Sequence, residues 1–190
     1  MDDLSAPTGT EDALRAVARE DGSAPRALVL GATGYVGGRL VPRLLSGGWR
    51  VRVLSRSAER IRALPWADRV EIVEGDAADA GALAEGVGDV DALFHLVHSM
   101  SSGRDFDSRD REIASAVARA ASHAGVRRIV YLGGLDPRGV SLSRHLASRV
   151  EVGDILLASG VPTLVLQAGV IIGSGSASFE MGRHLTDGLP

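Results

Sequence analysis

The stretch Gly31-Ala32-Thr33-Gly34-Tyr35-Val36-Gly37 follows the apolar run 27–30 and opens a helix-like segment. Each glycine has its own task in that context. Gly31 allows a sharp turn out of a strand, Gly34 lets the backbone approach a phosphate, and Gly37 lets the helix pack closely on the sheet. The free N–H groups and the dipole of the helix start favour an anion. The stretch therefore predicts a pyrophosphate-binding loop, and the alternative is a glycine-rich turn without a ligand.

Outward from this loop, short apolar runs alternate with helix-length segments. The apolar runs are 27–30, 50–55, 70–73, 92–97, 128–132 and 163–166. The helix-length segments are 35–45, 59–64, 80–86, 105–124 and 143–159. Apolar runs separated by helices predict βαβ units and a parallel sheet that is covered on both faces. The fold class is therefore α/β, a doubly wound parallel sheet of the Rossmann type with strand order 3-2-1-4-5-6.

The two ends of the chain differ from this alternating middle. Residues 1–24 are small and polar, and they predict a flexible leader or a loosely docked helix. Residues 25–173 form the predicted dinucleotide-binding domain. Residues 174–190 are expected to begin a C-terminal substrate-side region. Because little sequence remains there, that region is either short or continues in a longer protein of which this chain is a fragment.

Composition narrows the class of protein. The chain has 190 residues, 45% of them hydrophobic, and no cysteine, which excludes disulfides, thiolate metal sites and a cysteine nucleophile. A net charge of −3 argues against nucleic acid or an anionic membrane as a partner. The histidines show no metal-ligand spacing, so no metal is expected. With neither a signal-like start nor a membrane-length apolar run, the sequence predicts a soluble cytoplasmic protein.

The end of the second apolar run bears on the choice of dinucleotide. It reads Ser55-Arg56-Ser57, without the acid that binds the ribose 2′-hydroxyl of NAD. The guanidinium of Arg56 and the hydroxyl of Ser55 suit a 2′-phosphate instead. NADP(H) is therefore favoured over NAD(H), and the alternative is that Arg56 is an ordinary surface arginine. The charged run 104–111 predicts only a solvated helix start.

The GxxGxxG spacing resembles the short-chain dehydrogenase/reductase superfamily, specifically its extended and atypical branches, over residues 26–173. The run ending Tyr131-Leu132-Gly133-Gly134-Leu135 is similar to the NmrA-like NAD(P)-binding proteins. This resemblance implies that Asp76 contacts the adenine amino group and that Ala77 donates its backbone N–H. A helix N-cap is the alternative role for Asp76, and both roles are compatible.

The resemblance also assigns residues on the adenine-ribose side and on the nicotinamide side of the cofactor cleft. It implies that the ends of two further strands line the cleft, with Leu96, Val97 and His98 on the adenine-ribose side. Gly169 matches the glycine of a Pro-Gly turn that lies beside the nicotinamide, although the proline is absent. It further implies a homodimer formed through the helices 105–124 and 143–159.

Typical members of the superfamily carry Tyr-x-x-x-Lys, in which the lysine lowers the tyrosine pKa and the tyrosine exchanges a proton. Here His145-x-x-x-Arg149 occupies those positions, with both side chains on one helical face. Histidine exchanges protons near neutral pH, whereas arginine fixes a nearby oxygen and depresses the pKa of a neighbouring histidine. The alternative is a solvated or interface face. A glycine of the pair Gly133-Gly134 also stands where an assisting serine would help.

Two functions follow from this pattern. The first is an atypical NADP(H)-dependent oxidoreductase or epimerase-like enzyme that acts on an unknown small molecule, with His145 as proton donor and Arg149 as its supporting cation. The second is a non-catalytic NADP(H)-sensing regulator whose cofactor occupancy changes the binding of a protein partner. The enzyme is placed first because most of the superfamily is enzymatic.

Overall fold

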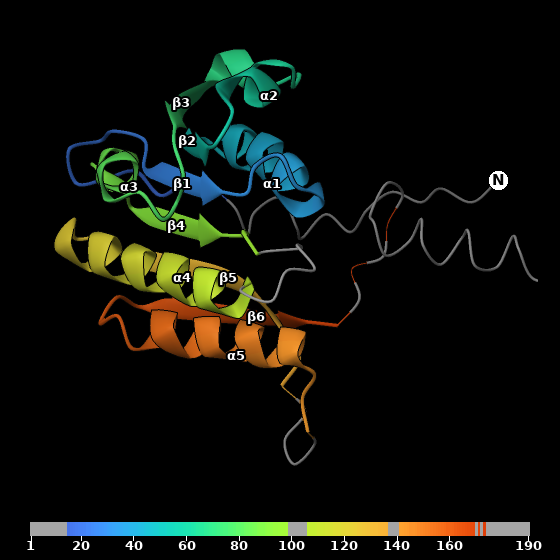
Figure 1. The fold of residues 1–190 in the computed structure, drawn as a ribbon. Coiled ribbons are helices and arrows are strands. Elements are labelled where there is room, and N and C mark those ends of the chain that lie inside the picture. Colours follow the sequence, from blue (N-terminus) through green and yellow to red (C-terminus); the bar gives the residue numbers. More distant parts are fainter. Residues whose placement is uncertain (1–14, 99–105, 137–140, 170, 172, 174–190) are drawn as a thin grey trace, which may run out of the picture.

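A six-stranded parallel sheet with strand order β3-β2-β1-β4-β5-β6 forms the centre of the protein (Figure 1). The computed structural model describes residues 15–98, 106–136, 141–169, 171 and 173. The strands are β1 (Arg26–Leu30), β2 (Arg50–Ser55), β3 (Val70–Glu74), β4 (Ala92–His95), β5 (Arg128–Gly134) and β6 (Thr163–Ala168). All neighbouring strands pair in parallel. The predicted fold class and strand order are therefore confirmed.

Helices lie on both faces of this sheet, at bounds within two residues of the predicted segments. They are α1 (Tyr35–Ser46), α2 (Ala58–Arg62), α3 (Ala80–Val87), α4 (Phe106–His123) and α5 (Arg144–Leu157), with a short 3-10 turn at Ala67–Arg69 that the sequence did not predict. Helices α4 and α5 pack against each other along one face (Figure 1). They are the helices through which the resemblance implies a homodimer, and that assembly stays a prediction.

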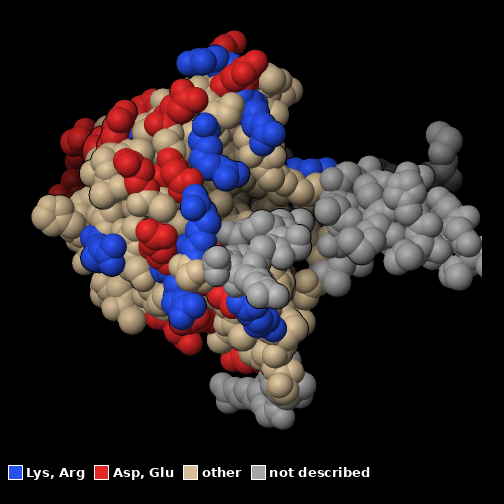
Figure 2. All heavy atoms as spheres, viewed as in Figure 1, with Lys and Arg blue, Asp and Glu red and all other residues tan. Residues whose placement is uncertain are grey.

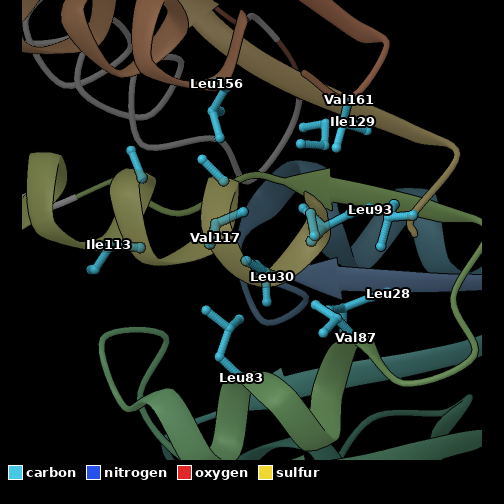
Figure 3. Packing of buried hydrophobic residues seen from close by; sticks show 14 of the residues in the cluster. Leu28, Leu30, Leu83, Val87, Leu93, Ile113, Val117, Ile129, Leu156 and Val161 are labelled. Atoms are coloured by element: carbon cyan, nitrogen blue, oxygen red, sulfur yellow. The ribbon is translucent and has the colours of Figure 1, made fainter. Parts of the chain in front are cut away.

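The central strand β1 shows why the apolar runs are continuous. Leu28 and Leu30 lie near residues of α3 and α4, in a buried cluster that extends to α5 (Figure 3). Ala27 and Val29 point to the other face and pack against α1 and α2. A strand that is buried on both faces needs apolar side chains at every position. The sheet therefore holds the carboxyl ends of its strands rigidly beneath the glycine loop.

The described part of the predicted leader, residues 15–24, contacts the domain. Arg19 Nε and Nη2 donate to Asp91 Oδ2 at 2.8 and 2.6 Å, and the N–H of Ala16 donates to the carbonyl of Gly47 at 2.8 Å. These bonds fix the segment at the amino ends of the central strands, opposite the glycine loop, so residues 15–24 belong structurally with the domain. Residues 1–14 and 174–190, on which the remaining boundary predictions fall, lie outside the described residues.

Cover over the sheet is uneven. Leu164 and Leu166 of β6 are 50% and 46% exposed, on a face that no described helix covers. On the face turned to the viewer in Figure 2, arginine and acidic side chains are interleaved. None of the helices in the described ranges is both long enough and apolar enough to cross a membrane.

Candidate cofactor-binding site

The glycine loop has the geometry that its separate tasks require. Gly31 has φ +89°, and a Cβ there would lie 3.0 Å from the backbone carbonyl of Leu96. A Cβ on Gly37 would overlap the Gly31 carbonyl oxygen and lie 2.7 Å from Ala32 Cα. A Cβ on Gly34 would meet only the Gly31 oxygen, at 3.3 Å. Gly31 and Gly37 therefore serve close packing, whereas Gly34 is exposed and a side chain there would make a single tight contact.

Helix α1 begins directly after this loop, and its N-terminus is suited to bind an anion. Gly34 is its N-cap and brings no side-chain cap, and its first turn contains no acidic residue. The first N–H groups of an α-helix have no partner within the helix. Here they belong to Tyr35, Val36 and Gly37. The Arg39 guanidinium lies 3.6 Å from the centre of the Tyr35 ring and stabilises its position.

A cavity of about 440 Å³ opens outside the carboxyl ends of β1, β2 and β3, and we call it the β2–β3 cavity. Its volume is typical of small-molecule sites. It brings together many of the predicted residues, namely Gly31, Thr33, Ser55, Arg56, Asp76, Ala77, Val97 and His98. Apolar side chains of Leu54 and Ile113 complete its walls. Arg109 and Asp110 of α4 also line it. The prediction that the run 104–111 is a solvated helix start was wrong for Asp110, which is buried, whereas Arg109 is exposed.

Asp76 is held at this cavity by two contacts. Its Oδ1 accepts the N–H of Ala78 at 2.9 Å, and its Oδ2 accepts Arg109 Nη2 at 2.6 Å. The N-cap of α3 is Asp79, which accepts the N–H of Ala82 at 2.7 Å. The alternative role of Asp76 as the helix N-cap is therefore wrong, and its carboxylate remains on the cavity wall.

Arg56 and Ser55 follow β2 at the same cavity but differ in their surroundings. Ser55 Oγ donates to the carbonyl of Ser57 at 3.1 Å, so its hydroxyl helps to form the turn. Ser57 in turn caps α2 by accepting the N–H of Arg60. Arg56 is exposed, and within the described ranges no acid pairs with it. Its guanidinium is thus available for an external anion.

A second cavity, of about 400 Å³, lies on the other side of the glycine loop, and we call it the α5 cavity. It brings together the predicted residues Gly31, Thr33, Gly34, Tyr35, Val36, Gly37, Leu96, Val97, His98, Arg149 and Gly169. Four of these, Gly31, Thr33, Val97 and His98, also line the β2–β3 cavity, so the two adjoin. Leu96 lines only the α5 cavity, and its place on the adenine-ribose side stays a prediction.

Arg149 is the cation of the α5 cavity, and its side chain passes close to Gly134. Arg149 Nη2 donates to the carbonyl of Leu132 at 2.8 Å. A Cβ on Gly134 would lie 3.5 Å from Arg149 Cβ and Cδ and 3.0 Å from Leu146 Cδ2. Tyr131, which is buried in the core, donates its hydroxyl to the carbonyl of Arg149 at 3.1 Å. The missing side chain at position 134 thus allows α5 to approach β5 closely.

His145 does not line either cavity. It is exposed on α5, and its ring centre lies 6.4 Å from that of His98. Burial lowers the pKa of His98, and the charges of Arg149 and His145 lower it further, against a smaller opposing effect of Asp110. Behind His98, burial lowers the pKa of the fully enclosed His95 to about 4. Both rings are therefore held towards their neutral form.

These features agree with a comparison against known families. A family model described as NAD(P)H-binding matches residues 31–158, more than half of the chain. The chain therefore belongs to this NAD(P)H-binding family, and solved structures that include a short-chain dehydrogenase/reductase superfamily protein share its fold. The predicted binding of a dinucleotide through a Rossmann-type domain is confirmed at this level.

Curated relatives include reductases and epimerases. The chain is 33% identical over 151 residues to ceramide reductase of Caulobacter vibrioides, covering 77% of this chain and 46% of the relative. It is 37% identical over 119 residues to UDP-glucose 4-epimerase of Mycolicibacterium smegmatis, covering 56% of this chain and 37% of the relative. The chain thus spans less than half the length of these relatives.

Solved structures share the fold. The Bordetella bronchiseptica enzyme WbmH in complex with NAD+ matches with a TM-score of 0.71 at 22% identity, over 86% of this chain and 63% of that one. The Citrobacter sp. triphenylmethane reductase complexed with NADP(H) matches with a TM-score of 0.63 at 21% identity, over 76% and 50% of the two chains. Neighbours therefore bind either dinucleotide.

Proposed function

We propose that this chain is the NADP(H)-binding part of an atypical short-chain reductase or epimerase-like enzyme, with His145 as its proton-exchanging group and Arg149 as the supporting cation. One observation carries the proposal. Arg149, four residues after His145 on α5, lines the same cavity as the glycine loop and Gly169. A cation that serves only a solvated helix face would not be held inside that cavity.

The chemistry divides between the two side chains. A bound nicotinamide cofactor supplies a hydride to a carbonyl carbon, and the carbonyl oxygen then needs one proton. We assign that proton to His145, which lies outside the cavity with its ring centre 6.4 Å from that of the cavity-lining His98, because an imidazole can exchange a proton. Arg149 stays charged and cannot act as a base, so its part is to donate hydrogen bonds and hold positive charge near the reacting oxygen.

The choice of NADP(H) over NAD(H) rests on Arg56 and is tested by calorimetric titration with NADPH, NADP+, NADH and NAD+. We expect Arg56→Asp to weaken binding of the two phosphorylated forms by about a hundredfold, because a charged hydrogen bond is lost and a repulsive charge is added. Binding of NADH should be kept or improved. The exposed Arg62→Asp on α2 is the matched control, because it makes the same charge change outside both cavities. Equal losses for all four ligands would contradict the assignment.

The role of His145 is tested on a panel of carbonyl and quinone substrates with NADPH. On any substrate that is turned over, His145→Phe should lower kcat by about a hundredfold or more and remove an inflection from the pH profile. His123→Phe, at the exposed end of α4, is the control for loss of an imidazole. Unchanged turnover in the His145 variant would remove this residue from the mechanism.

A second candidate is the cofactor-sensing regulator, and Gly134 favours it. A serine there would press its Cβ against Leu146, so this position does not offer the hydroxyl that assists catalysis in typical relatives. The regulator predicts tight cofactor binding, unequal affinity for the oxidised and reduced forms, and no consumption of NADPH across the panel. Turnover of any substrate at a rate typical of enzymes would exclude it.

A further inference from the structure

Arg109 of α4 reaches across the mouth of the β2–β3 cavity. Its Nη2 lies 2.6 Å from Oδ2 of Asp76, which follows β3, and both side chains line the cavity. The two side chains are 47% and 30% exposed. They are 33 positions apart in the sequence, so the contact joins two separate elements above the same space.

This ion pair is not what holds α4 in place. Pairs between exposed side chains contribute little to stability because water screens them and two long side chains must be ordered. Helix α4 is instead anchored by Ile113, Ala114 and Val117, which are buried against the sheet (Figure 3 shows Ile113 and Val117). The contact between Arg109 and Asp76 therefore adds little to the stability of the fold, and its effect is on the lining of the cavity.

The chemistry of the cavity lining suits a planar base. Leu54 and Ile113 give it apolar walls, while Arg56 and Arg109 supply its cations. A guanidinium is planar and stacks on the face of an aromatic ring, which an ammonium group cannot do in the same way. The carboxylate of Asp76 fixes the plane of Arg109 through a charge-assisted hydrogen bond.

We propose that Arg109 is an adenine-stacking residue, oriented by Asp76, and that it sets affinity for the adenosine part of the cofactor independently of the 2′-phosphate. The inference rests on the dinucleotide binding proposed above, with the adenine over β2 and β3. Arg56 and Arg109 then divide the work. Arg56 distinguishes the phosphorylated from the unphosphorylated ribose, and Arg109 binds the ring that both ligands share.

Four ligands separate the two roles: NADPH, NADH, adenosine 2′,5′-bisphosphate and 5′-AMP. By calorimetry, Arg109→Gln should weaken all four by a similar factor of about fivefold, the size of a partly exposed cation–π contact. Arg109→Lys keeps the charge but loses the plane, so we expect it to resemble Arg109→Gln. Arg56→Gln should weaken only NADPH and the bisphosphate. In the double variant Asp76→Asn/Arg109→Gln, the loss should be smaller than the sum of the single losses, because Asp76 acts partly through Arg109.

Arg111→Gln is the matched control. Arg111 lies on the same helix, is 48% exposed and pairs with Glu151 at 3.4 Å, but it lines neither cavity. A loss confined to the 2′-phosphorylated ligands, full rescue by Arg109→Lys, or an effect no larger than that of Arg111→Gln would each overturn the inference. If the wild-type chain binds none of the four ligands, the proposed function itself fails, which distinguishes the two.

Discussion

The two adjoining cavities differ in how their polar groups are satisfied. At the β2–β3 cavity, both oxygens of Asp76 and the hydroxyl of Ser55 have hydrogen-bond partners. At and behind the α5 cavity, Arg149 Nε and His95 Nδ1 are buried without a partner among the described residues. Buried polar atoms without partners lower stability, so each calls for an explanation. In the first region the fold itself fixes Asp76 and Ser55 and leaves the exposed Arg56 for an external anion, whereas the second region contains buried polar atoms without a described partner.

Breaking the loop that both cavities share should have the largest effect. Gly37→Ala places a Cβ against the backbone of Gly31 and Ala32, so we expect the free energy of unfolding to fall by about 3 kcal/mol. Binding of NADPH and of adenosine 2′,5′-bisphosphate should be lost together. Gly38→Ala is the control, because its nearest atom is Ala32 O at 3.8 Å. In a helix interior that change should stabilise by up to about 1 kcal/mol, as measured by urea unfolding. Similar results for both variants would show that the close packing at Gly37 is not decisive.

The lowered pKa of the buried His95 makes the free energy of unfolding depend on pH. The pKa of His95 is about 4 in the folded chain and about 6.5 when unfolded. As pH falls through this window, the unfolded chain takes up the proton first, so the free energy of unfolding decreases, by about 3 kcal/mol in total. The lowered pKa of His98 acts in the same direction.

Urea unfolding at several pH values between 6.5 and 4 tests this expectation. His95→Gln removes the titrating group, so its curve should be flatter through that window, whatever its stability at pH 7. His123→Gln, at the exposed end of α4, is the control for removing an imidazole. Parallel curves for wild type and the His95 variant would mean that another group causes the acid sensitivity.

Arg149 should affect only one end of the cofactor. It lines the α5 cavity and not the β2–β3 cavity. Arg149→Met should therefore weaken NADPH by about tenfold, the size of one lost charged hydrogen bond, and leave adenosine 2′,5′-bisphosphate unchanged. Arg144→Met is the control on the same helix, since Arg144 pairs with Asp107 outside both cavities. Equal losses for both ligands would place the effect in the stability of the domain instead.

The sequence predicted the fold and most lining residues because the responsible signals are local. Alternating apolar runs and helical segments define the sheet, and a strand, a glycine loop and a helix in succession define the phosphate site. Arg109 was missed because charge at a helix start has the same pattern whether it faces water or a cavity. Asp76 and Asp79 are equally suited to capping, and only the three-dimensional path of the chain shows that Asp79 caps α3.

The sequence also could not connect Gly134 with Arg149. In the sequence each looks like a separate departure from the usual catalytic pattern. In the structure, however, the side chain of Arg149 passes the place where a side chain at position 134 would begin. The chain contains no lysine, so all 21 of its basic side chains other than histidine are arginines. Arginine at position 149 is therefore the cation that this composition supplies, and His145 is the more informative departure.

The smallest expected effect tests that connection. In Gly134→Ala the new Cβ would meet Leu146 Cδ2 at 3.0 Å, and because this is the end of a flexible side chain, the loss of stability should be about 1 kcal/mol. If Gly134 sets the place of Arg149, NADPH should also bind more weakly, by less than in Arg149→Met, with the bisphosphate unaffected. A stability loss without any change in NADPH binding would mean that Arg149 keeps its place without the glycine. Gly134 and Arg149 would then be independent of each other, and the hydrogen bond to the carbonyl of Leu132 alone would hold Arg149 at the α5 cavity.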